Sequence, residues 1–276
     1  MVTPPPPAAV ARPMPVVFAG HGSPMNAIED NTWHWHWRLL GERLPRPRAI
    51  LCVSAHWEAQ GARLTGASHP STIHDFFGFP QALFDVQYPA PGSLKLARRV
   101  EELLGGHKHA HVDATRGLDH GAWSVLRGMY PAADVPVVQL SIDTALPGAH
   151  HYALAKKLAP LRREGVLILG SGNLVHNLAL WDWRDPTPVD WAVRFDDAVK
   201  RRIAARDHAD LIDWQRLGED ARRAIPTPEH YLPLLYVLAL QADGDRVRFF
   251  NEDVVGALAM TSVLVDAGGI DFGRNP

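Results

Sequence analysis

The amino-acid sequence predicts an α/β fold, in which a sheet is covered by helices on both faces, within one domain over residues 16–276. Short apolar runs suited to buried strands recur along the chain, and segments with helical periodicity lie between them. Strands that are apolar along their whole length are typical of a sheet whose two faces are both covered. No internal repeat or linker divides the chain after residue 15. We therefore expect a single domain with a mostly buried central sheet.

Each predicted element depends on its own pattern, taken in chain order. Residues 1–15 contain four consecutive prolines, which indicate a disordered arm and cannot form the apolar helix of a signal peptide. Short, mostly apolar runs predict strands over Val16–Ala19, Ala49–Ser54, Val135–Ile142 and Val166–Leu169. Apolar residues at helical spacing predict helices over Ser93–Leu104, Trp123–Met129, His150–Leu161, Trp191–Arg206 and Pro228–Leu240.

Composition excludes several classes of function. With 28 Lys+Arg against 30 Asp+Glu, the chain has a formal charge of -2 and lacks the basic surface of a protein that binds nucleic acid or an anionic membrane. No apolar stretch reaches the roughly 18 residues of a membrane helix, so we expect a cytoplasmic protein. We also expect it to be a monomer or a small homo-oligomer. Cys52 is the only cysteine, which excludes an intramolecular disulfide and a cysteine zinc cluster. Against this background, 15 histidines stand out.

Some of these histidines stand where a ligand site would form. His21, His56 and His176 each come just after a predicted strand, and His230 begins the last helical pattern. Ligands of open α/β sheets bind beyond the carboxyl ends of the strands, so we expect these side chains to converge. A single half-buried histidine more often only bonds a carbonyl group. Several neutral imidazoles without carboxylates, however, are typical of a divalent transition-metal site.

Other histidines favour structural explanations. The WHWHW segment Trp33–Trp37 predicts a helix with one aromatic face on the core and one exposed histidine face. The alternating histidines of His107–His111 predict a solvated edge strand. His120 is either a site residue or the start of a helix capped by Asp119, and both interpretations stay open. The chain has no GxSxG, HExxH or P-loop motif, which argues against several familiar enzyme classes.

Seven segments occur in a fixed order between about Val16 and Leu264: HGSPMNAIED, VSAHWEAQG, TIHDFFGFPQALFDVQYPAPGS, GLDHGAWSVLRGMYP, VPVVQLSID, GSGNLVHNL and PTPEHYLPLLYVL. With these segments the chain resembles the class III extradiol ring-cleavage dioxygenases, in their 4,5-DOPA dioxygenase-like branch. The resemblance implies a single three-layer α/β/α domain that binds one divalent metal ion in a pocket at one edge of the sheet.

The resemblance also implies roles for the histidines. It implies that His21, His56 and His230 bind the metal, and that His176 is a further ligand or an acid/base beside it. The wider class holds Fe(II) with two histidines and one glutamate, whereas in this branch His230 stands at the glutamate position. A ligand set made only of histidines suits Zn(II) in the resting protein as well as Fe(II) for ring cleavage.

The implied reaction inserts O2 and opens the ring of a small catechol, DOPA-like or a related phenolic acid. One group must take a catechol proton and another must donate a proton as the O–O bond breaks, and histidine does both. We assign these roles to His176 first and His120 second. Residues Gly170–Asn173 are expected to form the pocket floor and to let His176 move, and Thr72–Phe79 to form one wall.

Two other functions remain open from the residues alone. A zinc-dependent hydrolase of small esters or amides would activate a bound water. Against it stands the lack of an obvious carboxylate base near the ligand motifs, apart from Glu58 and Glu229. A non-catalytic metal-binding or interaction protein would use Trp33–Trp37 as its contact surface and would have no pocket over the metal.

Overall fold

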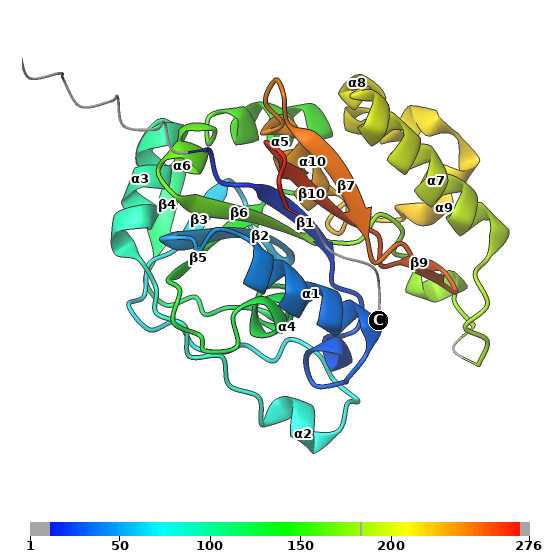
Figure 1. Ribbon diagram of the computed structural model, residues 1–276, viewed down its shortest axis with the longest axis horizontal. Helices are drawn as coiled ribbons and strands as arrows, with labels where there is room; N and C mark the ends of the chain where they lie inside the picture. Colours follow the sequence, from blue (N-terminus) through cyan, green and yellow to red (C-terminus); the bar gives the residue numbers. More distant parts are fainter. Residues whose placement is uncertain (1–11, 183, 271–276) are drawn as a thin grey trace, which may run out of the picture.

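A mixed eight-stranded sheet forms the centre of the molecule in the computed structural model, which describes residues 12–182 and 184–270 (Figure 1). Its strands lie in the order β4-β3-β5-β2-β6-β1-β10-β7. Strands β5, β2, β6 and β1 are parallel, so their carboxyl ends meet at one edge. The strand bounds are β1 Val16–Gly20, β2 Ala49–Glu58, β3 Ala62–Thr65, β4 Ala110–Asp113, β5 Val137–Ile142, β6 Val166–Gly172, β7 Arg246–Phe250 and β10 Ser262–Asp266, with β8 Val254–Val255 and β9 Leu258–Ala259 in a separate two-stranded sheet.

Helices cover both faces of this sheet, which confirms the predicted three-layer α/β/α architecture (Figure 1). Along β2, Leu51 and Val53 contribute to one apolar core while Ile50 and Cys52 contribute to the other, so both faces are buried. Helices α1 and α4 cover the second core, and α3, α5, α7 and α10 contribute to the first. The helices are α1 Thr32–Arg43, α2 Gln81–Phe84, α3 Leu94–Leu104, α4 His120–Met129, α5 Gly148–Lys156, α6 Pro160–Arg163, α7 Asp190–Ala205, α8 His208–Ile212, α9 Glu219–Ala224 and α10 Leu232–Ala239, with 3-10 turns η1 Pro24–Ala27, η2 Leu178–Leu180 and η3 Trp214–Leu217.

Two predicted helices were wrong in extent because of proline. The expected helix over His150–Leu161 ends at Lys156, and a separate turn of helix starts at Pro160, whose ring cannot continue a helix and which donates no amide hydrogen. The helix predicted from Pro228 begins only at Leu232, with Pro233 in its first turn. His230 therefore lies in the turn before α10.

One prediction about exposed histidines was wrong, and another was right in exposure but wrong in extent: His107, His109 and His111 are all exposed and β4 is an edge strand, but the strand is shorter than expected. Helix α1 contains the WHWHW segment as expected, but His36 is buried and its Nδ1 contacts Asn251 Oδ1 from the last part of the chain. Of the alternating histidines, only His111 lies in strand β4. His107 and His109 lie in the preceding turn, which Gly105 and Gly106 enter with positive φ.

The start of the described chain packs onto the domain. Residues 1–11 of the predicted arm lie outside the described residues, but Met14 is already buried, and its amide donates to Arg162 O.

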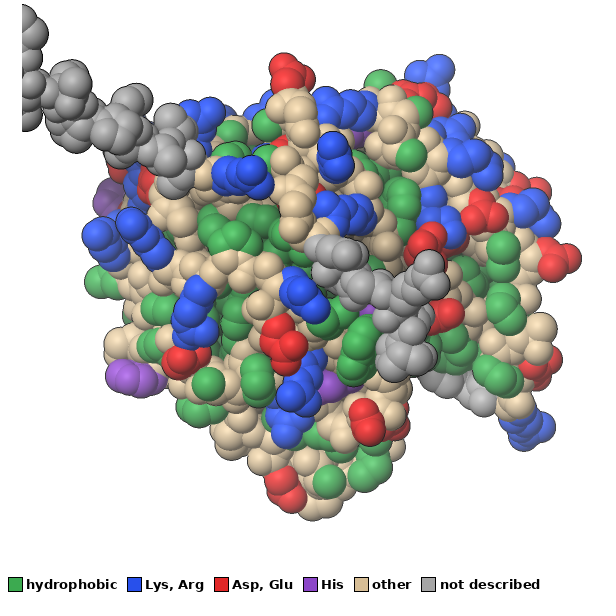
Figure 2. All heavy atoms as spheres, viewed as in Figure 1, with side chains coloured by type: hydrophobic (Ala, Val, Ile, Leu, Met, Phe, Trp, Pro, Cys, Tyr) green, Lys and Arg blue, Asp and Glu red, His purple; other side chains and the backbone are tan. Residues whose placement is uncertain are grey.

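No helix among the described residues is long and apolar enough to cross a membrane. Basic and acidic side chains are interspersed over the face seen in Figure 2, in keeping with the net charge of -2.

Candidate metal centre

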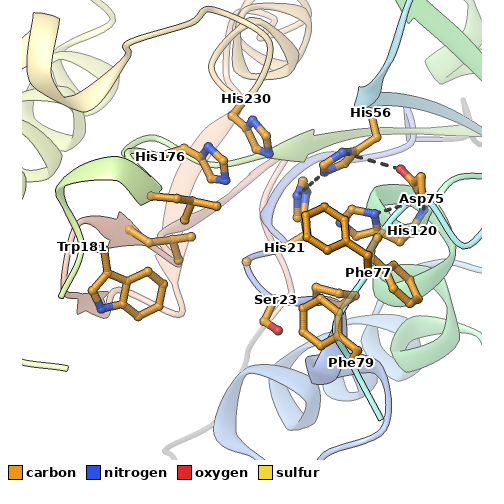
Figure 3. Close-up of a pocket in the computed structure, with 15 residues that line it drawn as sticks. His21, Ser23, His56, Asp75, Phe77, Phe79, His120, His176, Trp181 and His230 are labelled. Atoms are coloured by element: carbon orange, nitrogen blue, oxygen red, sulfur yellow. Dashed lines mark hydrogen bonds and ion pairs between the residues drawn. The ribbon is translucent and has the colours of Figure 1, made fainter. Parts of the chain in front are cut away.

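Three histidines converge at the carboxyl edge of the parallel strands. His21 follows β1, His56 lies near the end of β2, and His230 lies in the turn before α10 (Figure 3). One ring nitrogen from each lies within 4.8 Å of the others, and the Nε2 atoms of His21 and His56 are 3.0 Å apart. Two nitrogens that each bind one ion at about 2.1 Å lie about 3.0 Å apart when the two bonds meet at a right angle. The spacing therefore suits a single metal ion.

Oxygen atoms contact the opposite nitrogen of two of these rings. The Nδ1 atom of His21 is 2.9 Å from Ser171 Oγ, and the Nδ1 atom of His230 is 3.1 Å from Glu229 Oε1. Metal-binding imidazoles commonly hold an oxygen in this way, which fixes the ring orientation. The Nε2 atom of His230 is buried and has no hydrogen-bond partner among the described residues. Because buried polar atoms normally have a partner, this free nitrogen fits a metal ligand.

Burial keeps the three imidazoles uncharged at neutral pH. Loss of hydration, reinforced by the neighbouring histidines, lowers the pKa of His21 and of His230 well below the ordinary value. Burial, with His120 nearby, likewise lowers the pKa of His56 to about 3. A metal ion binds the neutral imidazole, so the site is already in its ligating form.

The end of strand β6 packs closely against the backbone of His230. The amide of Asn173 donates to His230 O over 2.9 Å, and a Cβ atom on Gly172 would lie 2.0 Å from that same oxygen. Only glycine allows this close approach. Gly170–Gly172 form a fully buried part of β6 and do not line the cavity, so the expected mobile pocket floor was wrong. These glycines instead make room for the backbone of α10 and of His230.

His176 lies beside this group rather than within it. Its ring stacks on His230 with 3.4 Å between ring centroids and 8° between ring planes (Figure 3). Its ring nitrogen groups with Glu229 and His230, and not with His21 and His56. Burial lowers the pKa of His176 to about 4, so it too is neutral at pH 7. A neutral imidazole next to the ligand group is placed to accept a proton.

His120 and Asp75 form a second pair on the other side of the site. Asp75 Oδ1 accepts the backbone amide of His120 over 2.9 Å and lies 3.0 Å from its Nδ1, and Asp75 Oδ2 lies 3.7 Å from His56 Nδ1. Although burial opposes it, the hydrogen bond and charge of His120 lower the pKa of Asp75 to about 2. Asp119 also caps α4 as predicted, by accepting from Ala122 N. His120 is thus both a helix start and a site residue.

Sequence reasoning missed Asp75, although it lies inside the segment Thr72–Phe79 that was expected to form a wall. The local signal was an acidic residue within the aromatic run HDFF. That run does form a wall, because Asp75, Phe76, Phe77 and Phe79 all line the cavity. Sequence reasoning also missed the contact between Glu229 and His230 Nδ1, because side chains adjacent in a helix point about 100° apart, whereas these two residues lie in the turn before α10.

A cavity of about 430 Å³ opens over the histidines. In Figure 3, Trp181 lies on the opposite side of this cavity from Phe77 and Phe79, with the five histidines along its inner wall. The volume lies within the range of small-molecule sites, and apolar walls with a few convergent polar groups are typical of them. The arrangement therefore combines a candidate metal site with two flanking imidazoles and with room for an aromatic ring.

Comparisons with known proteins point in one direction. The family model described as the catalytic LigB subunit of aromatic ring-opening dioxygenase matches residues 15–262. A protein of Escherichia coli (strain K12) named 4,5-DOPA dioxygenase extradiol is 46% identical over 257 residues, which cover 91% of this chain and 94% of that protein. A Beta vulgaris protein of the same name is 36% identical over 249 residues, covering 87% and 92%. The crystal structure of an uncharacterized protein from Escherichia coli K12 matches with a TM-score of 0.80 at 42% identity, covering 91% of this chain and 99% of that one.

Proposed function

The chain belongs to the family of the catalytic LigB subunit of aromatic ring-opening dioxygenases, and we propose that it opens the ring of a small catechol of the DOPA type at a metal ion bound by His21, His56 and His230. It is an extradiol ring-cleaving dioxygenase, a metal-dependent enzyme that takes a small-molecule substrate and O2. The observation that carries the proposed ligand set is the convergence of three neutral imidazoles, one of which keeps a buried nitrogen without a partner.

The proposed ligands leave the proton transfers to other side chains. A divalent ion held by His21, His56 and His230 would supply Lewis-acid and redox chemistry. His176, neutral at pH 7, accepts a proton from one catechol hydroxyl and returns it later in the reaction. Asp75 holds His120 by its backbone amide and Nδ1, which leaves Nε2 of His120 for a second proton transfer in the cavity.

The contacts of the nearby carboxylates argue against the zinc hydrolase. Asp75 lines the cavity, but it is held by the backbone amide and Nδ1 of His120. Glu229 accepts from Thr227 Oγ1 over 2.8 Å and contacts His230, and Glu58 accepts from Thr144 Oγ1 over 2.6 Å. Neither glutamate lines the cavity, so neither is positioned as a base for a bound water. The cavity itself argues against a closed, non-catalytic metal site.

The identity of the metal, the location of the protein and its oligomeric state are further parts of the proposal. We propose Fe(II) as the metal for ring cleavage and Zn(II) as an ion that the resting site also accepts, because an all-histidine set suits both. We also propose that it acts in the cytoplasm as a monomer or small homo-oligomer, in keeping with the near-neutral composition of the sequence.

Anaerobic reconstitution with Fe(II) tests the proposal. After O2 is admitted with a catechol, we expect O2 uptake and growth of a yellow semialdehyde absorbance. His21→Ala, His56→Ala and His230→Ala should each lose bound metal and activity, since two imidazoles bind an ion far more weakly than three. His69→Ala, which removes an exposed histidine that does not line the cavity, is the matched control. Turnover of no catechol by the iron-loaded protein contradicts ring opening, and stoichiometric metal in one of the three variants removes that histidine from the ligand set.

A further inference from the structure

The backbone of His56 lies where strand β2 leaves its regular pairing. Against β5, the register of β2 shifts between Val53 and Glu58, and against β6 the paired residues of β2 end at Ser54. Side chains bond both main-chain groups of His56 there. Its amide donates to Ser54 Oγ over 3.2 Å, and its carbonyl oxygen accepts from Arg116 Nη2 over 3.2 Å. The position of this candidate ligand therefore depends on two side chains as well as on the sheet.

These two side chains meet at one buried carboxylate, that of Asp119. Ser54 Oγ donates to Asp119 Oδ1 over 2.7 Å, and Arg116 Nη2 lies 3.5 Å from Asp119 Oδ2. From strand β5, Gln139 bonds Asp119 twice: its Oε1 accepts the backbone amide of Asp119 over 2.9 Å, and its Nε2 donates to Oδ2 over 2.7 Å. Asp119, Ser54 and Gln139 are all fully buried. The carboxylate is thereby held against the sheet.

The same carboxylate fixes the start of helix α4. Asp119 is the N-cap of this helix and accepts the amide of Ala122 at Oδ1 over 3.1 Å, so the cap places the first helical residue, His120. A Cβ atom on Gly121 would lie 2.9 Å from His56 Cδ2, which shows how closely the helix and the strand approach. The centroids of the His56 and His120 rings lie 3.9 Å apart (Figure 3). A shift of α4 relative to β2 therefore changes how these two rings lie.

We propose, on the basis of the ligand set proposed above, that Asp119 is a positioning residue of the metal centre. Through Ser54 and Arg116 it holds the backbone of His56. As the cap of α4 it also places His120. Asp119 does not line the cavity, so it acts through these residues and does not contact the substrate.

Asparagine at position 119 keeps the shape of the side chain and removes one acceptor oxygen. If its NH2 group takes the place of Oδ2, it faces Gln139 Nε2, and if it takes the place of Oδ1, it faces the amide of Ala122. In either case two donors face each other, and one of them is left buried without an acceptor, which disfavours the native arrangement. We therefore expect Asp119→Asn to displace the start of α4 relative to the end of β2.

The first measurement is the affinity of Asp119→Asn for Zn(II), in competition with a chromophoric chelator. Loss of a contact that orients a metal ligand typically costs about 10–100-fold in metal affinity, and we expect a loss in this range. Asp245→Asn is the matched control, because Asp245 is a buried carboxylate that accepts from Arg162 and from the amide of Ala242 and does not line the cavity. That variant should lose stability, measured by thermal unfolding, and keep its affinity for Zn(II).

Ser54→Ala tests the link to His56 by a smaller change, and it decides the question if Asp119→Asn does not fold. It removes one hydroxyl group that bonds both the His56 amide and Asp119. We expect about a tenfold loss of affinity for Zn(II) and a changed visible absorption of Co(II) bound in its place, because this absorption follows the ligand geometry. Ser141→Ala, which removes another buried hydroxyl group with two partners, should change neither. The double variant of Ser54 and Asp119 should lose little more than Asp119→Asn alone, since both act in one network.

Wild-type affinity for Zn(II) in folded Asp119→Asn or Ser54→Ala overturns the proposal, and so does an equal loss in a variant and its control. His56→Ala supplies the reference. Retained metal in that variant contradicts the ligand set itself, whereas metal lost there but bound normally by Ser54→Ala contradicts the positioning role alone. None of these measurements requires turnover, so a protein that cleaves no catechol contradicts ring opening and leaves the positioning role intact.

Discussion

Replacing Gly172 with alanine is expected to weaken metal binding by displacing His230. A Cβ atom at this position would lie 2.0 Å from His230 O and 3.0 Å from His230 C, and both neighbours are backbone atoms. Contacts shorter than 3.0 Å do not persist, so the backbone of His230 has to move by about 1 Å. The amide of Asn173, which bonds the same oxygen, has to move with it or lose that bond.

The expected loss of metal affinity follows from the narrow range of ligand distances that a metal site accepts. Ligand distances are held within about 0.2 Å, so a displacement of about 1 Å takes the His230 nitrogen out of bonding range unless the loop relaxes. With partial relaxation, we expect at least a tenfold loss of affinity, as when a contact that orients a ligand is removed. The added methyl group should also lower the free energy of unfolding by about 1–3 kcal/mol, the usual effect of overpacking.

The assay is competition for Zn(II) against a chromophoric chelator, with thermal unfolding of the metal-free protein measured in parallel. Gly92→Ala is the matched control, because its Cβ would lie 1.9 Å from Ala67 O and Gly92 does not line the cavity. That variant should lose stability to a similar extent and keep its affinity for Zn(II). Unchanged affinity in Gly172→Ala, or an equal loss in both variants, refutes the argument that Gly172 positions His230.

Three further predictions concern the proton-transfer groups and pH. His176→Ala should keep stoichiometric metal and lose about 10²–10⁴-fold in kcat, the effect of a missing acid/base; loss of metal to the same extent as in His56→Ala would identify it as a ligand instead. Asp75→Asn should lower kcat more than it raises KM, because the carboxylate orients His120 and Asn accepts fewer hydrogen bonds; a wild-type rate would exclude that role. The metal-free protein should lose stability as pH falls from about 6.5 to about 4. The unfolded chain protonates its histidines near pH 6.5, whereas native His56 and His176 have pKa values of about 3 and about 4, so each costs about 2 kcal/mol at pH 5. Urea unfolding at pH 7.5 and pH 5 checks this, and equal stability at the two values contradicts it.

Patterns local in the chain were enough to predict the central strands. β1, β2, β5 and β6 are buried on both faces, so each contains a mostly apolar run that is visible without knowledge of its neighbours. The edge strands β4 and β7, and β3 next to β4, have exposed or half-buried positions and carry no such signal. The family resemblance added the order and number of layers, which local patterns do not encode.

The convergence of the histidines could also be predicted from local patterns. Parallel strands end at a common edge, so histidines placed just after β1 and β2 meet there whatever the details of packing. Their residue type and position along the strands are both properties of the sequence. The sequence by itself therefore determined that His21, His56, His176 and His230 gather at the candidate metal centre, but not that Asp75 joins them.

Only the tertiary structure decided which atoms of those side chains face one another. Asp75 bonds His120 from 45 positions away, and Ser171 reaches His21 from 150 positions away, because strand order brings these segments together. The stacking of His176 on His230 and the glycine at position 172 that admits the His230 backbone likewise depend on contacts between separate elements. Periodicity reports whether a position is buried, but the identity of its partner depends on how distant segments pack.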